Sequence, residues 1–452
     1  MSDLVKRFRD FFSEEGKTIN LPQPEKEWTF LVYLAGDNNL ESAGIDDINE
    51  MEQAGGSSDK VNVVIQFDRI LGYDLGNADW ITTKRFYVKK GESDYKIESI
   101  EIEDLGETNT GDPKVLEDFL NWGIENFPAK HYAVILWNHG AGWKDTDIYY
   151  RAMKVAKNVR TPQKSRERGR IINFRSDHAR KSLFVSTILG SLTFTTRGIA
   201  YDDSNRDFLD NYELERTLAK VTKKMNRKID ILGMDACLMA MIEVSYQNKE
   251  YIDYVVASEE NEPGDGWPYD QIIKKLNERP EMDAAEFSRT IVQEFIKSYK
   301  GRSDVTQSSM KTVVLEELAT SVSKLAVSLI NNLDNYESQI KTIYNEVLTY
   351  RDWDYVDLKD FAQLVKKYIP NEASIAEEVI KHIDKVVVEA GGNGAGISIY
   401  LPYSNYSRVY ANLHWAKKTK WDEFFKACVK RGLGLEKREK YNEFMKGTDL
   451  IY

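Results

Sequence analysis

The sequence is poor in cysteine and in long apolar runs, and each shortage excludes a class of protein. Of its 452 residues only two are cysteines, Cys237 and Cys428, which cannot build a disulfide framework or a cysteine-rich zinc site. The nearest candidate for a membrane span, residues 182–196, is half polar and shorter than the roughly 18 apolar residues required. The N-terminus is charged and lacks the apolar core of a secretory signal, so we expect a cytoplasmic protein without a membrane span.

A net positive charge is also lacking, except in one segment. The chain carries 62 Lys and Arg against 73 Asp and Glu, and its formal net charge of −11 argues against a general nucleic-acid binder. Residues 148–197 are the exception, because they hold 12 Lys or Arg and only two acids. A segment so unlike its surroundings is typical of an exposed insertion, and we treat it as one.

Apolar runs alternate with helical patterns along the first part of the chain. Continuous apolar runs predict strands buried on both faces, and they span residues 28–36, 61–67, 131–140, 229–237 and 254–258. Because helical patterns separate these runs, we predict an α/β fold with a mostly parallel sheet flanked by helices. Residues 80–103 alternate in polarity and predict a β-hairpin.

The composition divides the chain into three parts. We expect a helical arm and linker over residues 1–27, an α/β core over 28–283 that carries the basic insertion, and a helix-rich C-terminal subdomain over 284–452. In the last part, residues 396–404 predict one strand that returns to the sheet or packs beside it, and residues 421–431 predict a final helix.

Two reactive side chains end consecutive buried strands of the predicted sheet. His139 ends the third strand and Cys237 the fourth, at the carboxyl edge where parallel α/β sheets carry their sites. A thiol becomes a nucleophile once it loses its proton, and a nearby imidazole can take that proton. Cys237 also opens a predicted helix, whose dipole would favour a thiolate. The N–H groups of Gly140 and Cys237 could together form an oxyanion hole.

Each of these residues has an ordinary alternative. Taken alone, Cys237 would be a small buried hydrophobe and His139 a hydrogen-bonded histidine at the sheet edge. The two together, at consecutive strand ends, favour catalysis. We can name no residue that orients His139 except Asp202, which is a guess.

Around these residues the sequence resembles the clostripain family of cysteine peptidases, within the caspase–gingipain–separase structural group. The resemblance covers roughly residues 28 to 270 and is carried by WTFLVYLAGDNNLE, YAVILWNHGAGW, GIAYDDSNRDFLDNYEL and IDILGMDACLMAMIEVSYQ. It implies a caspase-like fold, a catalytic dyad of His139 and Cys237, and cleavage after basic residues. Members of the family are also known for calcium dependence and for internal processing.

Acidic residues near the thiol fit a preference for basic substrates. Asp235 lies two residues before Cys237, and Asp265 lies in a loop after the fifth strand. A carboxylate at the floor of a pocket would hold a substrate Arg by a bidentate pair or a Lys by a point charge. The alternatives are a helix N-terminal acid for Asp235 and an ordinary turn residue for Asp265. Glu259 and Glu260 are weaker candidates in the same region.

The sequence requires no cofactor, and calcium enters only through the resemblance. The run that begins at Asp203 superficially copies an EF-hand loop, but Phe208 stands where that loop needs Gly. Asp202, Asp203 and Asp207 remain weak candidates for calcium in another geometry, against ordinary turn chemistry.

We therefore predict a cysteine endopeptidase whose partners are protein or peptide substrates with Arg or Lys at the cleavage site. The main alternative is a non-catalytic caspase-like scaffold that binds acidic partners through its helical part and basic insertion. A third hypothesis, contact of residues 182–196 with an anionic membrane, ranks lower because that stretch resembles a hairpin more than an amphipathic helix.

An enzyme of this specificity would carry a substrate within its own chain. The basic insertion joins the part with His139 to the part with Cys237, and we expect it to cover the cleft until it is cut. The most polar run of the insertion holds the likeliest cleavage residues, Lys164, Arg166, Arg168 and Arg170.

Overall fold

The structure of the chain is a computed structural model, which describes residues 19–440 apart from residues 141, 144–198 and 206. Most of the expected N-terminal arm and the whole basic insertion lie outside the described residues. So do the expected cleavage residues Lys164, Arg166, Arg168 and Arg170. Among the described helices, none combines the length and the apolar character needed to cross a membrane.

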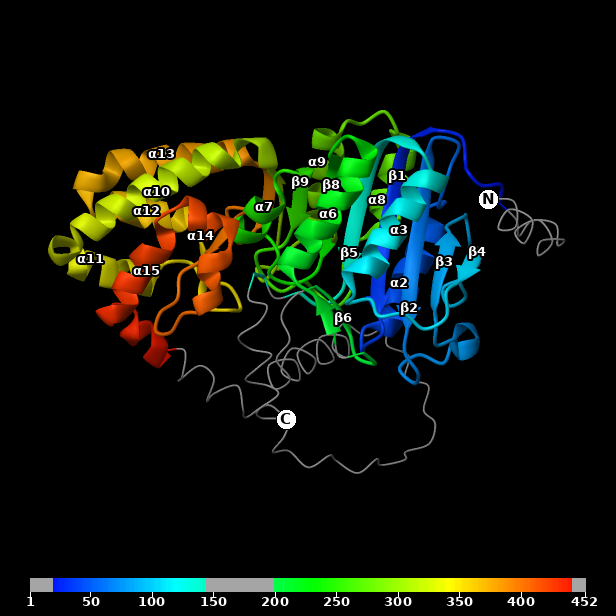
Figure 1. Cartoon of the computed structure of the whole chain (residues 1–452), viewed down its shortest axis with the longest axis horizontal. Helices are drawn as coiled ribbons and strands as arrows, with labels where there is room; N and C mark the ends of the chain where they lie inside the picture. The colour runs from blue at the N-terminus through cyan, green and yellow to red at the C-terminus, as the bar shows by residue number, and fades with distance from the viewer. Residues whose placement is uncertain (1–18, 141, 144–198, 206, 441–452) are drawn as a thin grey trace, which may run out of the picture.

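A nine-stranded mixed sheet forms the centre of the protein, in the order β12-β10-β9-β8-β5-β1-β2-β3-β4 (Figure 1). Its parallel part consists of β9 (Ile252–Ala257), β8 (Ile229–Asp235), β5 (Ala129–Trp137), β1 (Lys26–Gly36) and β2 (Val61–Arg69). These are the five predicted apolar runs, and the mostly parallel α/β sheet is confirmed. The predicted hairpin is the antiparallel pair β3 (Thr83–Tyr87) and β4 (Ile100–Asp104).

Helices cover both faces of this sheet (Figure 1). One face carries α2 (Glu41–Gln53), α8 (Tyr269–Glu278) and α9 (Ala284–Ser298), and the other carries α3 (Pro113–Asn126), α6 (Asn211–Met225) and α7 (Ile242–Asn248). Successive side chains of a strand point to opposite faces, so the neighbours Phe30 and Leu31 lie in two different hydrophobic cores. Burial on both faces explains why the central strands are apolar without alternation.

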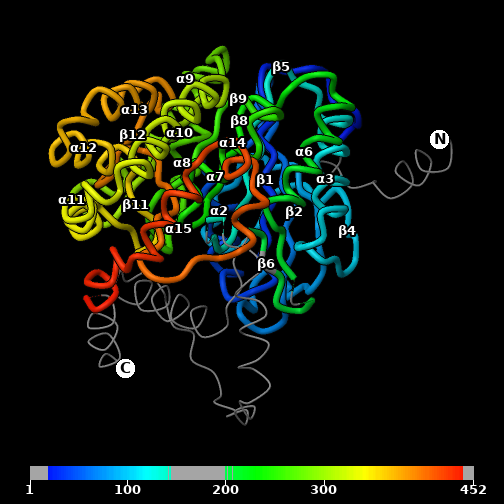
Figure 2. Tube along the Cα trace, turned by 60° about the vertical axis from the view of Figure 1, so that its left-hand side comes forward, coloured from blue at the N-terminus to red at the C-terminus, as the bar shows by residue number. Residues whose placement is uncertain are grey.

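Helix-rich segments fill the C-terminal part, as expected, and gather at one side of the sheet (Figures 1 and 2). They are α10 (Leu315–Asn331), α11 (Leu333–Glu346), α12 (Leu358–Tyr368), α13 (Ala373–Val386), α14 (His414–Lys418) and α15 (Trp421–Lys430). The final helix, predicted over residues 421–431, is α15.

The strand expected within residues 396–404 is present, but it packs beside the central sheet rather than joining it. Residues 396–404 contain β13 (Ser398–Tyr400), which pairs with β11 (Tyr355–Asp357) in a separate two-stranded sheet. The main sheet is instead completed by the antiparallel strands β10 (Thr306–Lys311) and β12 (Val387–Gly392). Sequence analysis missed both because β10 is mostly polar and β12 continues the apolar pattern of α13 without a break. The sheet therefore crosses the boundary expected near residue 283.

Candidate active site

The carboxyl ends of β5 and β8 bring His139 and Cys237 to one edge of the sheet. The two strands are parallel neighbours, and Trp137 pairs with Asp235 in their register. His139 lies two residues beyond Trp137, and Cys237 lies two residues beyond Asp235, so the pair occupies matching positions after neighbouring strands. Both side chains line one pocket.

A side-chain amide from a third strand end holds the imidazole. His139 Nε2 lies 3.0 Å from Oδ1 of Asn39, which follows β1, the other neighbour of β5. Because an amide oxygen can only accept, we assign the proton to Nε2, which leaves Nδ1 as the basic atom. The side chain of Asn138 links β1 to the residues after β5, because it donates to the Ala35 carbonyl and accepts from the His139 N–H. Sequence analysis did not find Asn39, and its guess of Asp202 is not the contact seen.

Surrounding protein keeps the imidazole neutral. The ring retains some contact with solvent, yet burial lowers the pKa of His139 to about 4. At neutral pH it is therefore unprotonated and able to accept a proton.

The thiol of Cys237 is buried and protonated in this conformation. It is 5% exposed and accepts a hydrogen bond from the Glu262 N–H at 3.4 Å. Burial, followed by the charge of Glu262, raises the pKa of Cys237 well above its usual value. Among the described residues no hydrogen bond joins Cys237 to His139, so the resting pair is a neutral thiol beside a neutral imidazole.

The expectation that Cys237 opens a helix is wrong. The helix α7 begins only at Ile242, and the residues before it turn and bond to the segment that follows β9, where the Ala240 N–H donates to the Ser258 carbonyl at 2.8 Å. The Leu238 N–H donates to the Glu260 carbonyl at 3.1 Å, and the backbone of Leu238 has a φ of 63°. Since a helix dipole acts only within its first turn, it gives the thiolate no support here.

Gly140 packs directly against the backbone of Cys237. A Cβ atom added to Gly140 would lie 2.4 Å from the Cys237 carbonyl oxygen and 3.0 Å from its nitrogen. Only glycine therefore allows the two strand ends to approach so closely. This approach places the backbones of Gly140 and Cys237 side by side, as an oxyanion hole built from them requires.

Three buried acids, Asp47, Asp235 and Glu262, line the same pocket. Asp47 accepts from the Trp137 indole at 2.6 Å, and Asp235 accepts from the Tyr269 hydroxyl at 2.8 Å. Burial raises the pKa of both Asp235 and Glu262, and the charge of Asp235 raises the pKa of Glu262 further. The two neighbouring carboxyls therefore resist being ionised together.

Of the acids predicted from the sequence, only Asp235 lines this pocket. Asp265 is exposed and is absent from the lining, although the residues on either side of it contribute to it. Glu259 and Glu260 bond groups of the helix-rich part instead. Sequence analysis missed the other two lining acids, Glu262 and Asp47. Glu262 lies in the same loop as Asp265, whereas Asp47 lies on α2, where no pattern in the sequence marks it.

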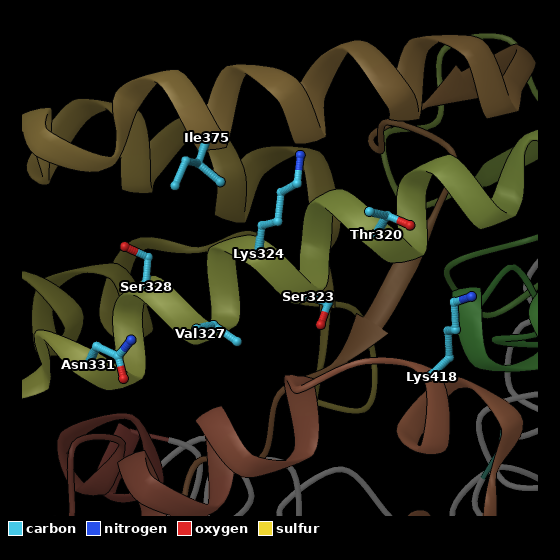
Figure 3. Close-up of a pocket in the computed structure, with 8 residues that line it drawn as sticks. All are labelled: Thr320, Ser323, Lys324, Val327, Ser328, Asn331, Ile375 and Lys418. Carbon is cyan, nitrogen blue, oxygen red and sulfur yellow. The ribbon is translucent and has the colours of Figure 1, made fainter.

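The pocket is narrow in this conformation. Its free space is about 30 Å³, which is room for little more than a water molecule. A second hollow lies between α10, α13 and α14 (Figure 3) and is lined by Thr320, Ser323, Lys324, Val327, Ser328, Asn331, Ile375 and Lys418. Because that lining contains no acid, thiol or imidazole, we assign it no chemistry.

The sequence candidates for calcium separate in the structure. Asp202 joins Asp37, Asp68 and Glu107 in a group of four acids, whereas Asp203 and Asp207 lie outside that group. Cys237 and Cys428 are both free thiols.

Comparisons with known proteins agree with this fold. The sequence matches the Clostripain family over residues 32–158 and 186–434. Clostripain of Hathewaya histolytica is 24% identical over 500 residues, which cover 95% of this chain and 84% of that protein.

Two solved structures extend the comparison. A secreted C11 cysteine protease from Bacteroides thetaiotaomicron, in complex with an irreversible peptide inhibitor, superposes with a TM-score of 0.59 at 19% identity and covers 88% of this chain and 100% of its own. An inactive zymogen C11 protease from Parabacteroides distasonis superposes with a TM-score of 0.58 at 20% identity, and the match covers 88% of this chain and 99% of that one.

The chain is thus a cysteine endopeptidase with a caspase-like α/β fold, not a non-catalytic scaffold. Within that class it belongs to the Clostripain family.

Proposed function

We propose that this endopeptidase cuts peptide bonds after Arg or Lys, with Cys237 as nucleophile and His139 as its base. The observation that carries the specificity is the buried acidic wall of Asp47, Asp235 and Glu262 beside the thiol. Buried carboxyls are stable when a cation pairs with them, and a substrate guanidinium or ammonium would supply that cation. Its positive charge would favour the ionised form of these carboxyls, after the narrow pocket widens to admit it.

The reaction would proceed through a thioester. His139 Nδ1 takes the Cys237 proton as the sulfur attacks the substrate carbonyl carbon, and the N–H groups of Gly140 and Cys237 stabilise the oxyanion. The imidazolium then gives its proton to the leaving amine as the C–N bond breaks. Water, activated by His139, attacks the thioester, which releases the carboxylic acid and restores the thiol. Because the described pair is not hydrogen-bonded, His139 and Cys237 must close on each other when substrate binds.

Asp235→Asn is expected to weaken cleavage after Arg and Lys selectively. Losing the charge that faces a desolvated substrate cation costs about 2 kcal/mol or more, so kcat/KM should fall by at least roughly 30-fold. Cleavage after Leu should change little. A fluorogenic panel with Arg, Lys, Asp or Leu before the scissile bond measures both effects.

Asp265→Asn is the matched control for this prediction, because it removes the same charge from an exposed position outside the pocket lining. We expect it to keep the Arg and Lys preference. If Asp235→Asn kept the preference for Arg and Lys, or if Asp265→Asn lost more of that preference than Asp235→Asn, the specificity acids would lie elsewhere.

We also propose that the enzyme processes itself within the basic insertion. The insertion lies between His139 and Cys237 in the chain and carries 12 Lys or Arg. Its pull toward the acidic pocket would favour cleavage at Lys164, Arg166, Arg168 or Arg170. The two products would stay together, because β5 and β8 are hydrogen-bonded neighbours in one sheet.

Wild-type protein is therefore expected to show two chains on a denaturing gel that co-elute in size exclusion. Cys237→Ala protein should remain a single chain, since it lacks the nucleophile. Replacing Lys164, Arg166, Arg168 and Arg170 together by Ala is the second control, and intact mass locates the cut. A wild-type chain that is both uncut and fully active would refute self-processing.

A further inference from the structure

Exposed apolar side chains gather at the carboxyl edge of the sheet, in and beside the loop that follows β2. Within the described part of the chain nine large apolar side chains are exposed, and five of them form this group, which we call the apolar loop surface: Leu71, Tyr73, Leu75, Ile81 and Tyr95. Leu71 and Leu75 are 68% and 76% exposed. Single apolar side chains on a surface are ordinary, but a local group of five is typical of a surface that binds an apolar partner.

Buried contacts hold the loop in this conformation. The guanidinium of Arg69, at the end of β2, is fully buried and donates to the carbonyls of Asp74 and Gly76 at 2.8 and 3.2 Å. The same guanidinium donates to the Glu41 carboxylate at 2.6 Å. Glu41 in turn accepts from the Asp74 N–H at 2.8 Å. The loop is therefore fixed from beneath, and its apolar side chains are left on the outside.

The backbone of the loop is also strained. Residues 77–79 are not glycines, yet all three have φ between 47° and 64°. Such a backbone is unfavourable for these residues and persists only where surrounding contacts impose it, which is common at functional sites. The Asn77 side chain supplies such contacts, because it donates to the Tyr95 carbonyl at 3.0 Å and accepts from the Ile97 N–H at 2.8 Å.

The anchor of the loop is part of the wall of the catalytic pocket. Glu41 is the first residue of α2, and the nearby Leu40, Ala43 and Asp47 line the pocket that holds Cys237. Leu40 and Ala43 are half-buried, so apolar surface continues at the start of α2. The pocket and the apolar loop surface therefore share one support.

The order of the strands sets the direction in which a substrate would leave the pocket. Cys237 follows β8, His139 follows β5, and the loop follows β2, which β1 separates from β5. In the proposed mechanism His139 gives its proton to the leaving amine, so the part of the substrate after the cleaved bond lies on the His139 side, toward β2. Neighbouring strands are about 4.8 Å apart, so β2 lies about 10 Å from β5. An extended peptide covers that distance in about three residues.

We propose that the apolar loop surface binds apolar side chains of the substrate, from about the third residue after the cleaved bond onward. The proposal rests on the proposed function, because it takes the direction of the peptide from the roles of Cys237 and His139. Its partner is a protein segment with Arg or Lys before the cleaved bond and Leu, Ile, Val, Phe or Tyr a few residues after it. Charge would select the bond, and the apolar contact would tighten binding.

The test compares two internally quenched peptides that differ only at the third to sixth residues after a single Arg. One peptide carries Leu and Phe at these positions, and the other carries Ser and Asn. We expect wild-type kcat/KM to be at least tenfold higher for the apolar peptide, mainly through a lower KM. A third peptide, in which a fluorophore directly follows the Arg, cannot reach the surface, so dividing by its kcat/KM removes any general change in activity.

Leu71→Ser and Leu75→Ser together are expected to reduce the apolar preference to threefold or less, with the Tm reporting that the fold is kept. Val313→Ser is the matched control, because Val313 is 66% exposed and lies between β10 and α10, far along the sheet from β2. It should keep the full preference. Tyr73→Ser repeats the test should the double variant fail to fold.

Equal cleavage of the two peptides by the wild type, or an unchanged preference in the double variant, would overturn the proposal. If the double variant changes only the oligomeric state in light scattering, the surface is a contact between copies of the chain, and the proposal is again overturned. A wild type that cuts after Leu but not after Arg would overturn the proposed specificity instead. The same apolar and polar sequences placed after that Leu would then decide the role of the surface.

Discussion

Cys237→Ala is expected to reduce peptide hydrolysis by roughly 100,000-fold or more, because removing the nucleophile of a cysteine or serine peptidase leaves little but binding and oxyanion stabilisation. The fold should survive, since the side chain is small and buried, and within the described part of the chain its one hydrogen bond comes from the Glu262 N–H. The measurements are the hydrolysis rate on a fluorogenic Arg peptide and the Tm.

Cys428→Ala is the matched control, because this cysteine is also buried but lies on α15, outside the pocket lining. It should keep wild-type turnover. Alkylation that abolishes activity should modify Cys237 alone, which intact mass and peptide mapping would show. Turnover comparable to wild type in Cys237→Ala would rule out the thioester mechanism.

His139→Ala is expected to lower kcat by roughly 1,000-fold or more, because the protonated thiol of Cys237 then has no base. His414→Ala is the control, since that histidine lies at the start of α14, outside the pocket. If both variants lose activity equally, the effect is structural and His139 is not the base.

The pH dependence tests the same residue. His139 acts as a base only when neutral, and burial lowers its pKa to about 4. The activity kcat/KM should therefore persist below pH 6 and fall only as the pH drops toward about 4, whereas an ordinary exposed histidine would protonate at about 6.5. Because Asp235 and Glu262 also titrate in this pocket, the profile is measured with a Leu substrate, which does not need their charge. An acid limb near 6.5 on that substrate would show that the imidazole of the active enzyme is solvated, unlike that of the described chain.

The apolar runs and the two strand-end residues could be predicted from the sequence because both signals are local. A strand buried on both faces needs a continuous apolar run, and the end of that run marks where a side chain emerges at the sheet edge. His139 and Gly140 lie within three residues of the end of β5, and Cys237 lies two residues after the end of β8. Their pairing required only that β5 and β8 be neighbours, as the structure shows.

The rest of the site comes from elements that are distant in the chain and carry no shared local signal. Asn39 meets His139 only because β1 lies beside β5, and Asp47 reaches the acidic wall from the helix after β1. Local patterns also misplaced the start of α7. They missed β10 and β12 because pairing with neighbouring strands, and not composition, makes these segments strands. The sequence by itself thus determined the class of fold and the pair of residues proposed to react. Only the tertiary structure decided what surrounds that pair. Strand order brings remote side chains together, and the resulting burial shifts their pKa values.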